Sequence, residues 1–236
     1  MDGTLVEQTR MRAGIARRMV ESKQQAPHFY VQTEVSVGPL QDRLAALNEG
    51  AEERTTMTVA LVRASVAALR EHPRLNAVWT ADGLLQAADV NVGIAIALED
   101  GLVAPALLGA DRLDVAGTAA ALRDLVERAR SQRLRPAELS EATFTLSNLG
   151  MFEVSAFTAI VTPPQVAILA TGRPVERWTG AGGSPERASL LTATLSADHR
   201  AVDGVDAARF LQTFKHALED PETLLAERAD PKEAMA

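Results

Sequence analysis

The stretch ASLLTATLSADHRAVDGVDAARFLQTFKHAL, residues 188–218, places polar reactive side chains between a strand and a helix. The β-rich apolar run Ala188–Ala197 predicts the strand, and the apolar spacing over Gly204–Leu218 predicts an amphipathic helix. Loops at strand ends often hold catalytic groups, and histidine titrates near neutral pH. His199, in the junction SADHRAVDG (196–204), is therefore a candidate for general acid–base chemistry.

The same junction also has a simpler interpretation. Asp203, four positions after His199, can cap the following helix, with His199 a surface turn residue. A metal site would need a third ligand, and the segment offers only Asp198, so we expect no metal. The second candidate is Ser147, at the end of a strand-like run in TFTLSNLG (143–150). Its flanks do not match G-x-S-x-G, so a hydrolase nucleophile is not supported, and a plain turn serine is the alternative.

Working outward, the periodicity predicts interleaved helices and strands, and therefore one α/β domain with a mixed sheet and flanking helices. We expect a flexible N-terminus over 1–10, the domain over 11–225 and a charged tail over 226–236. Glu99–Gly101 is expected to be a tight turn and Trp178–Pro185 a hairpin loop. The remaining helices are predicted over 12–22, 39–47, 56–69 and 114–130, and the remaining strands over 28–37, 89–97, 102–108, 142–147 and 165–171.

The composition narrows the function classes. The chain has 236 residues, 47% of them hydrophobic and 23% charged, which is typical of a soluble globular protein. A net charge of -7 argues against nucleic acid as a partner. The absence of cysteine excludes thiolate nucleophiles, iron–sulfur ligation and disulfides. No secretory signal and no membrane-spanning stretch are visible, so we expect a cytoplasmic protein with no membrane partner.

Five segments in order carry a resemblance to a known family. They are MRAGIARRMVESKQQAPHF (11–29), VNVGIAIALEDGLVAPAL (90–107), TFTLSNLG (143–150), FTAIVTPPQVAILATG (157–172) and DHRAVDG (198–204). Together they resemble the catalytic domain of the dihydrolipoamide acyltransferase component of 2-oxoacid dehydrogenase complexes, over about 11 to 225. Chloramphenicol acetyltransferase shares that fold more distantly. The resemblance therefore implies a two-layer, chloramphenicol acetyltransferase-like domain that forms homotrimers, with a cage of trimers as a further expectation.

The resemblance also implies roles for single residues. His199 would be the general base, and Ser147 would donate a hydrogen bond to the oxyanion. Asp203 and Arg18 are expected to pair and support the histidine loop. A weaker correspondence puts Asn148, Thr171 and Gly172 on the coenzyme A side of a channel between subunits. Coenzyme A or acetyl-CoA would be the co-substrate.

Two departures from the family pattern lie near this channel: Glu153 replaces a usual glycine, and Ala97 a frequent polar residue. The chain also shows no lipoyl domain, subunit-binding domain or Ala/Pro-rich linker, and starts with Met1. We therefore expect a stand-alone enzyme that moves a short acyl group from acetyl-CoA to a hydroxyl of a small natural-product acceptor, such as a tetronate hydroxymethyl group. The alternatives are the catalytic core of a dehydrogenase complex, acting between dihydrolipoamide and coenzyme A, and an inactive structural scaffold.

Overall fold

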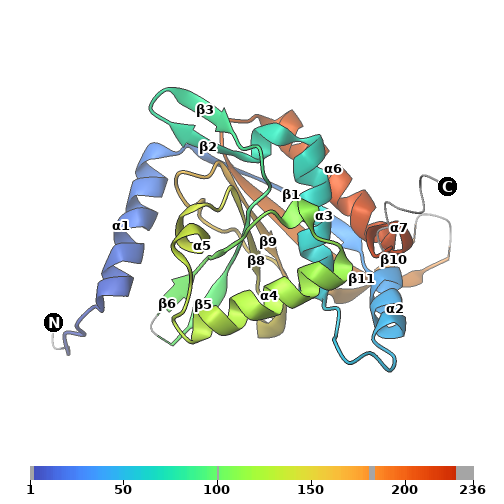
Figure 1. Cartoon of the computed structure of the whole chain (residues 1–236). Coiled ribbons are helices and arrows are strands. Elements are labelled where there is room, and N and C mark those ends of the chain that lie inside the picture. Colours follow the sequence, from blue (N-terminus) through green and yellow to red (C-terminus); the bar gives the residue numbers. More distant parts are fainter. Residues whose placement is uncertain (1–2, 100, 181–183, 227–236) are drawn as a thin grey trace, which may run out of the picture.

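The fold is built on one mixed sheet. The computed structural model describes residues 3–99, 101–180 and 184–226. Its main sheet has the strand order β1-β11-β9-β8-β4-β7, and β10 pairs with the first part of β11 (Figure 1). β8 runs parallel to both of its neighbours and the other pairs are antiparallel, which confirms the predicted mixed sheet. The strands are β1 (His28–Ser36), β4 (Val92–Ile94), β7 (Ala106–Leu107), β8 (Phe144–Asn148), β9 (Ala167–Thr171), β10 (Val175–Thr179) and β11 (Glu186–Asp198).

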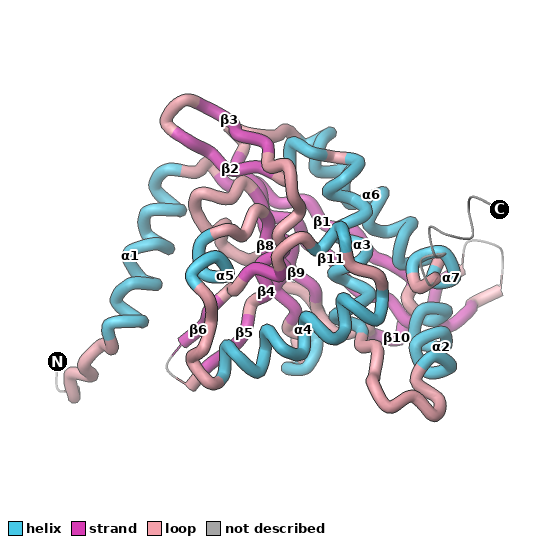
Figure 2. Tube along the Cα trace, in the orientation of Figure 1, coloured by secondary structure: helices cyan, strands magenta, loops and turns pink. Residues whose placement is uncertain are grey.

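Helices cover the sheet and close the core (Figure 2). Phe144 of β8 packs against Phe210 with ring centroids 5.5 Å apart, and Phe210 stacks on Phe214, all three fully buried. This apolar contact fixes the last long helix on the sheet. The helices are α1 (Arg10–Gln25), α2 (Gly38–Leu47), α3 (Met57–Glu71), α4 (Val115–Arg130), α5 (Pro136–Ser140), α6 (Gly204–Glu219) and α7 (Pro221–Leu224), with short 3-10 helices η1 (Pro73–Leu75), η2 (Ala110–Arg112) and η3 (Gly150–Phe152).

Side-chain caps explain where the predicted helices begin. The Thr56 hydroxyl accepts a hydrogen bond from the Val59 amide at the start of α3, and Asp114 accepts one from Gly117 at 2.6 Å at the start of α4. α1 lies at one side of the molecule, and Ser22 is its only buried residue (Figure 1). None of the described helices is long and apolar enough to cross a membrane.

The prediction of one continuous strand over 89–97 is wrong. The structure divides it into β4 and β5 (Ile96–Leu98), because the Ala95 amide donates to Leu146 in β8 while β5 turns away to pair with β6 (Gly101–Val103). The matching run over 102–108 is divided into β6 and β7 in the same way. Residue 100, in the predicted turn between them, lies outside the described residues.

Two hairpin features also differ from the expectation. The predicted loop over 178–185 is shorter, since Trp178 and Thr179 belong to β10 and pair with Arg187 and Glu186. Residues 181–183 of that loop lie outside the described part. The hairpin of β2 (Ala77–Thr80) and β3 (Gly83–Gln86) was not predicted, because each strand has only four residues and alternation over so few positions gives a weak signal.

Candidate active site

Ser147 lines a pocket of about 660 Å³. β8 holds it between the two parallel neighbours of that strand, and its side chain is 8% exposed. The walls come from the start of α3, the β4–β5 segment, α4 and η3, and they include the apolar side chains of Val59, Ile94, Leu122 and Phe152. None of the side-chain hydrogen bonds among the described residues involves Ser147 Oγ. Its hydroxyl is thus placed to donate to a ligand in the pocket.

Three arginines and one glutamate add charge to this pocket, namely Arg54, Arg123, Arg130 and Glu52. Arg123 also pairs with Glu53 at 2.6 Å. The sequence did not single out these arginines. Arg123 and Arg130 lie on the amphipathic helix α4, where basic residues normally face solvent, and Arg54 lies in the charged loop before α3. An apolar interior with guanidinium groups along its wall suits a ligand with both apolar and anionic parts.

Only one of the three predicted channel residues lines this pocket. Asn148 does so, donating to the Thr58 hydroxyl at 3.3 Å and accepting from the Gly150 amide at 2.8 Å. Thr171 is fully buried beside it in β9, and its hydroxyl has no partner among the described residues. Gly172 has a packing role, because a Cβ atom there would lie 2.1 Å from the carbonyl oxygen of Ser155.

His199 lies in the turn after β11 and is exposed. Its amide donates to the Pro27 carbonyl at 3.0 Å, which ties the turn to the start of β1. The imidazole lies beside Phe29 with ring centroids 4.7 Å apart and a tilt of 52°. Phe29 thus supports one side of the ring, a contact that the sequence alone did not indicate.

Asp203 caps α6, as the simpler interpretation of the junction expected. Its carboxylate accepts hydrogen bonds from the amides of Val205 at 2.8 Å and Asp206 at 3.0 Å. These two backbone bonds, with a smaller contribution from His199, hold the Asp203 pKa below its ordinary value. Arg18 is exposed on α1, and the described residues give it no ion pair. Within this chain the predicted pair of Arg18 and Asp203 is therefore not formed.

The sheet register keeps Ser147 and His199 apart. Ser147 is level with Ala170 in β9, which is level with Thr194 in β11. The turn with His199 begins four residues further along β11 and two strands away from Ser147. At about 4.8 Å between strands and about 3.3 Å per residue, this places the Cα atoms of Ser147 and Asp198 about 16 Å apart. One copy of the chain thus does not bring the predicted donor and base together.

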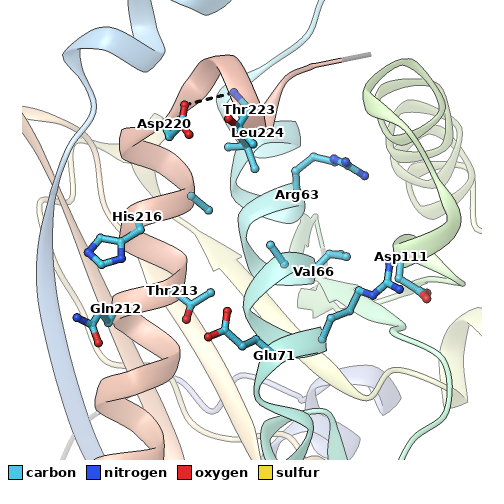
Figure 3. A pocket seen from close by; sticks show the side chains of 13 residues that line it. Arg63, Val66, Glu71, Asp111, Gln212, Thr213, His216, Asp220, Thr223 and Leu224 are labelled. Atoms are coloured by element: carbon cyan, nitrogen blue, oxygen red, sulfur yellow. Dashed lines mark hydrogen bonds between the residues drawn. The ribbon is translucent and has the colours of Figure 1, made fainter. Parts of the chain in front are cut away.

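Neither the groove between α3 and α6 nor His28 belongs to the lining of the Ser147 pocket. A groove of about 730 Å³ lies between α3 and α6, and its lining is mostly polar, as Figure 3 shows. Asp220, which lines the groove, accepts from the Thr223 amide to cap α7.

His28 uses both ring nitrogens, one toward the Ala26 carbonyl and the other toward the Val161 amide. The described residues contain no group of three or more potential metal ligands.

The family of the chain follows from comparison with known proteins. The model for 2-oxoacid dehydrogenases acyltransferase (catalytic domain) matches residues 2–226. The chain belongs to this family of acyltransferases. One relative is the dihydrolipoyllysine-residue acetyltransferase component of the mitochondrial pyruvate dehydrogenase complex of Schizosaccharomyces pombe, which is 40% identical over 216 residues, 89% of this chain and 45% of that protein. The chain spans about half the length of the curated relatives it matches.

Solved structures agree with this assignment. The dihydrolipoamide acetyltransferase of Azotobacter vinelandii superposes with a TM-score of 0.90 at 29% identity and 95% coverage of both chains. The cubic core of a pyruvate dehydrogenase multienzyme complex gives the same TM-score, identity and coverage. Chloramphenicol acetyltransferase, at 16% identity and a TM-score of 0.59, shares the fold, covering 86% of this chain and 94% of its own. The predicted family and fold are thus confirmed.

The expected transfer to a hydroxyl of a natural product is wrong. The relatives are dihydrolipoyllysine-residue acetyltransferases of pyruvate dehydrogenase complexes, which fits the alternative better. The expectation relied on the missing lipoyl segment and on Met1. That argument fails because the chain spans 35% to 55% of the length of these relatives, so its ends say nothing about the acceptor.

Proposed function

We propose that this chain is the catalytic core of a 2-oxoacid dehydrogenase complex and transfers an acetyl group between a dihydrolipoyl group and coenzyme A. The names of the relatives support the lipoyl and acetyl parts of this proposal. The observation that carries it is Ser147, an 8% exposed residue that lines a largely apolar pocket together with three arginines. Coenzyme A combines a thiol on a flexible arm with several phosphate groups, which suits such a pocket.

In the proposed mechanism, His199 accepts the proton from the thiol of coenzyme A. The resulting thiolate attacks the carbonyl carbon of the acetyl thioester on the dihydrolipoyl group. The Ser147 hydroxyl donates a hydrogen bond to the negative oxygen of the tetrahedral intermediate. The intermediate collapses, the bond between carbon and the leaving sulfur breaks, and that sulfur takes the proton back from His199. No acyl-enzyme forms, so the reaction needs no cysteine.

Residue spacing supports these roles. The Azotobacter vinelandii enzyme was investigated for the roles of a serine, a histidine and an asparagine, with the serine 52 residues before the histidine and the asparagine four after it. Ser147 also precedes His199 by 52 residues, and Asp203 follows it by four. Asp203 would then hold the position of that asparagine, where the cap of α6 ties it to the end of the histidine loop.

We further propose that the site forms between copies of the chain. The separation of about 16 Å across the sheet supports this, because proton transfer and oxyanion binding each need contacts of about 3 Å to the same reacting group. The similarity to a cubic core supports assembly of such copies into a larger particle, for which we propose trimers as the unit. An Arg18–Asp203 pair across such an interface stays a prediction.

The test is turnover by the purified chain, with acetyl-CoA and dihydrolipoamide as substrates and acetyl-dihydrolipoamide measured by mass spectrometry. Wild-type protein should form the product, and Ser147→Ala should lose about 100- to 1000-fold in kcat. Thr145→Ala, one pleat earlier on the same strand, is the matched control, since its hydroxyl binds Gln165 at 2.7 Å outside the pocket lining. No transfer by the wild-type protein, or full activity of Ser147→Ala, would overturn the proposal.

A further inference from the structure

The residues on both sides of His199 are locked to each other. Asp198 is 1% exposed, and its carboxylate accepts from Arg200 Nε at 3.0 Å and Nη2 at 2.6 Å. The Arg200 amide also donates to Asp198 Oδ1 at 3.0 Å. The amides of Ala201 and Val202 donate to the Asp198 carbonyl at 3.0 and 3.2 Å. The peptide that carries His199 is therefore held in a closed ring of hydrogen bonds.

A distant hairpin fixes this ring in place. The Arg200 guanidinium lies over the Trp79 ring of β2, 4.7 Å from its centroid. The Trp79 amide donates to the Pro164 carbonyl at 2.7 Å, and the Asp198 amide donates to the Val166 carbonyl at 2.9 Å. Both ends of the Arg200–Trp79 contact are thus anchored to the segment that leads into β9. A guanidinium over an aromatic face is attracted by the negative charge of the ring's π-system, so the contact holds the two side chains together.

The contacts of Arg200 argue against a role in binding substrate. Its guanidinium is committed to a buried carboxylate and to an aromatic face, and its side chain is 34% exposed. It does not line the pocket of Ser147. Arg200 is therefore placed to hold the histidine loop, whereas a substrate phosphate would have to compete with Asp198 for it.

We propose that Trp79 and Arg200 are positioning residues that aim His199 at the thiol. This inference rests on the proposed function, because it takes His199 as the base. A guanidinium is required, since lysine can neither bind the carboxylate through two nitrogens nor stack flat on the ring. A small displacement of the base is costly, because a shift of about 1 Å in a reacting group can reduce the rate by about 100-fold.

The test compares Trp79→Leu and Arg200→Lys with Trp79→Phe, which keeps an aromatic face. We expect kcat to fall by about 10- to 100-fold in the first two variants, with KM for both substrates within about twofold of wild type. Trp79→Phe should restore most of the rate. The double variant Trp79→Leu/Arg200→Lys should lose little more than the worse single variant, because both act through one contact.

Hydrogen exchange gives a measurement that does not depend on turnover. The amides of residues 199–202 should exchange faster in Trp79→Leu and Arg200→Lys than in wild type or Trp79→Phe. Arg200→Lys keeps the Trp79 side chain itself and removes only its stacking partner, so the test holds even if Trp79→Leu fails to assemble. Unchanged exchange and kcat would overturn the inference, as would a raised KM for coenzyme A with an unchanged kcat. A wild-type protein that transfers no acetyl group would refute the proposed function, while the exchange data would still decide whether the contact holds the loop.

Discussion

Two inactive variants should restore activity to each other when their chains assemble together. Ser147→Ala removes the oxyanion donor and His199→Ala removes the base, and each alone should retain at most about 1% of the wild-type rate. Under the proposed function, the separation of about 16 Å within one chain predicts that each site takes its serine from one copy and its histidine from the next. A Ser147→Ala chain thus still supplies His199 to a neighbouring copy, and a His199→Ala chain still supplies Ser147.

The expected recovery follows from simple counting. In oligomers assembled at random from equal amounts of the two variants, half of the serine positions are intact, and half of the neighbouring histidine positions are intact. About a quarter of the sites then contain both groups, whatever the number of copies in the ring. If serine and histidine acted within one copy, every site would lack one group and no activity would return.

The assay is co-expression of the two variants, purification of the mixed oligomers and measurement of acetyl transfer to dihydrolipoamide. The control mixes the two variants after each has assembled, which should give only the sum of the separate residual rates. A rate of about a quarter of wild type would support a site shared between copies. A co-expressed rate no higher than the control would refute the argument from the sheet register.

Three further predictions concern single residues. Glu153 has φ of 57°, a left-handed conformation that favours glycine, so Glu153→Gly should raise the free energy of unfolding by about 0.5–1 kcal/mol in urea titrations. Gly172→Ala should lower it by about 1–3 kcal/mol or more, because the added Cβ meets the Ser155 carbonyl. The lowered Asp203 pKa means that its charge stabilises the folded state above the ordinary pKa of about 4, and that this contribution is lost as the pH falls through the lowered pKa. The stability difference between wild type and Asp203→Asn should therefore shrink from about pH 5 to about pH 3 in urea titrations.

Matched substitutions control these predictions. Gln132→Gly changes a second non-glycine residue with positive φ among the described residues and should also stabilise, which separates the backbone effect from a local effect at the pocket. Gly204→Ala adds a Cβ in open space and should be nearly neutral. The packing argument is wrong if Gly172→Ala is as stable as wild type, and the backbone argument is wrong if Glu153→Gly is less stable. The pKa argument is wrong if the stability difference between wild type and Asp203→Asn does not change with pH.

Local pattern was enough for the long elements and for part of the site. Apolar periodicity and capping residues predicted α3, α4 and α6, because each buries one face over three or more turns. The polar junction after β11 pointed to His199, and the resemblance to the acyltransferase family pointed to Ser147. Glu153 was recognised as a departure from the family, and its left-handed backbone explains why a glycine is usual there.

Other features of the fold and of the site were decided only by the tertiary structure, because they depend on contacts between residues far apart in the chain. The division of residues 89–108 into four short strands follows from the partners that each strand finds, and no local period encodes that choice. The packing of Gly172 on Ser155 and of Arg200 on Trp79 joins segments that share no sequence pattern. The separation of Ser147 from His199 is a property of strand order and register, and strand order is set by which hydrophobic faces can be buried together.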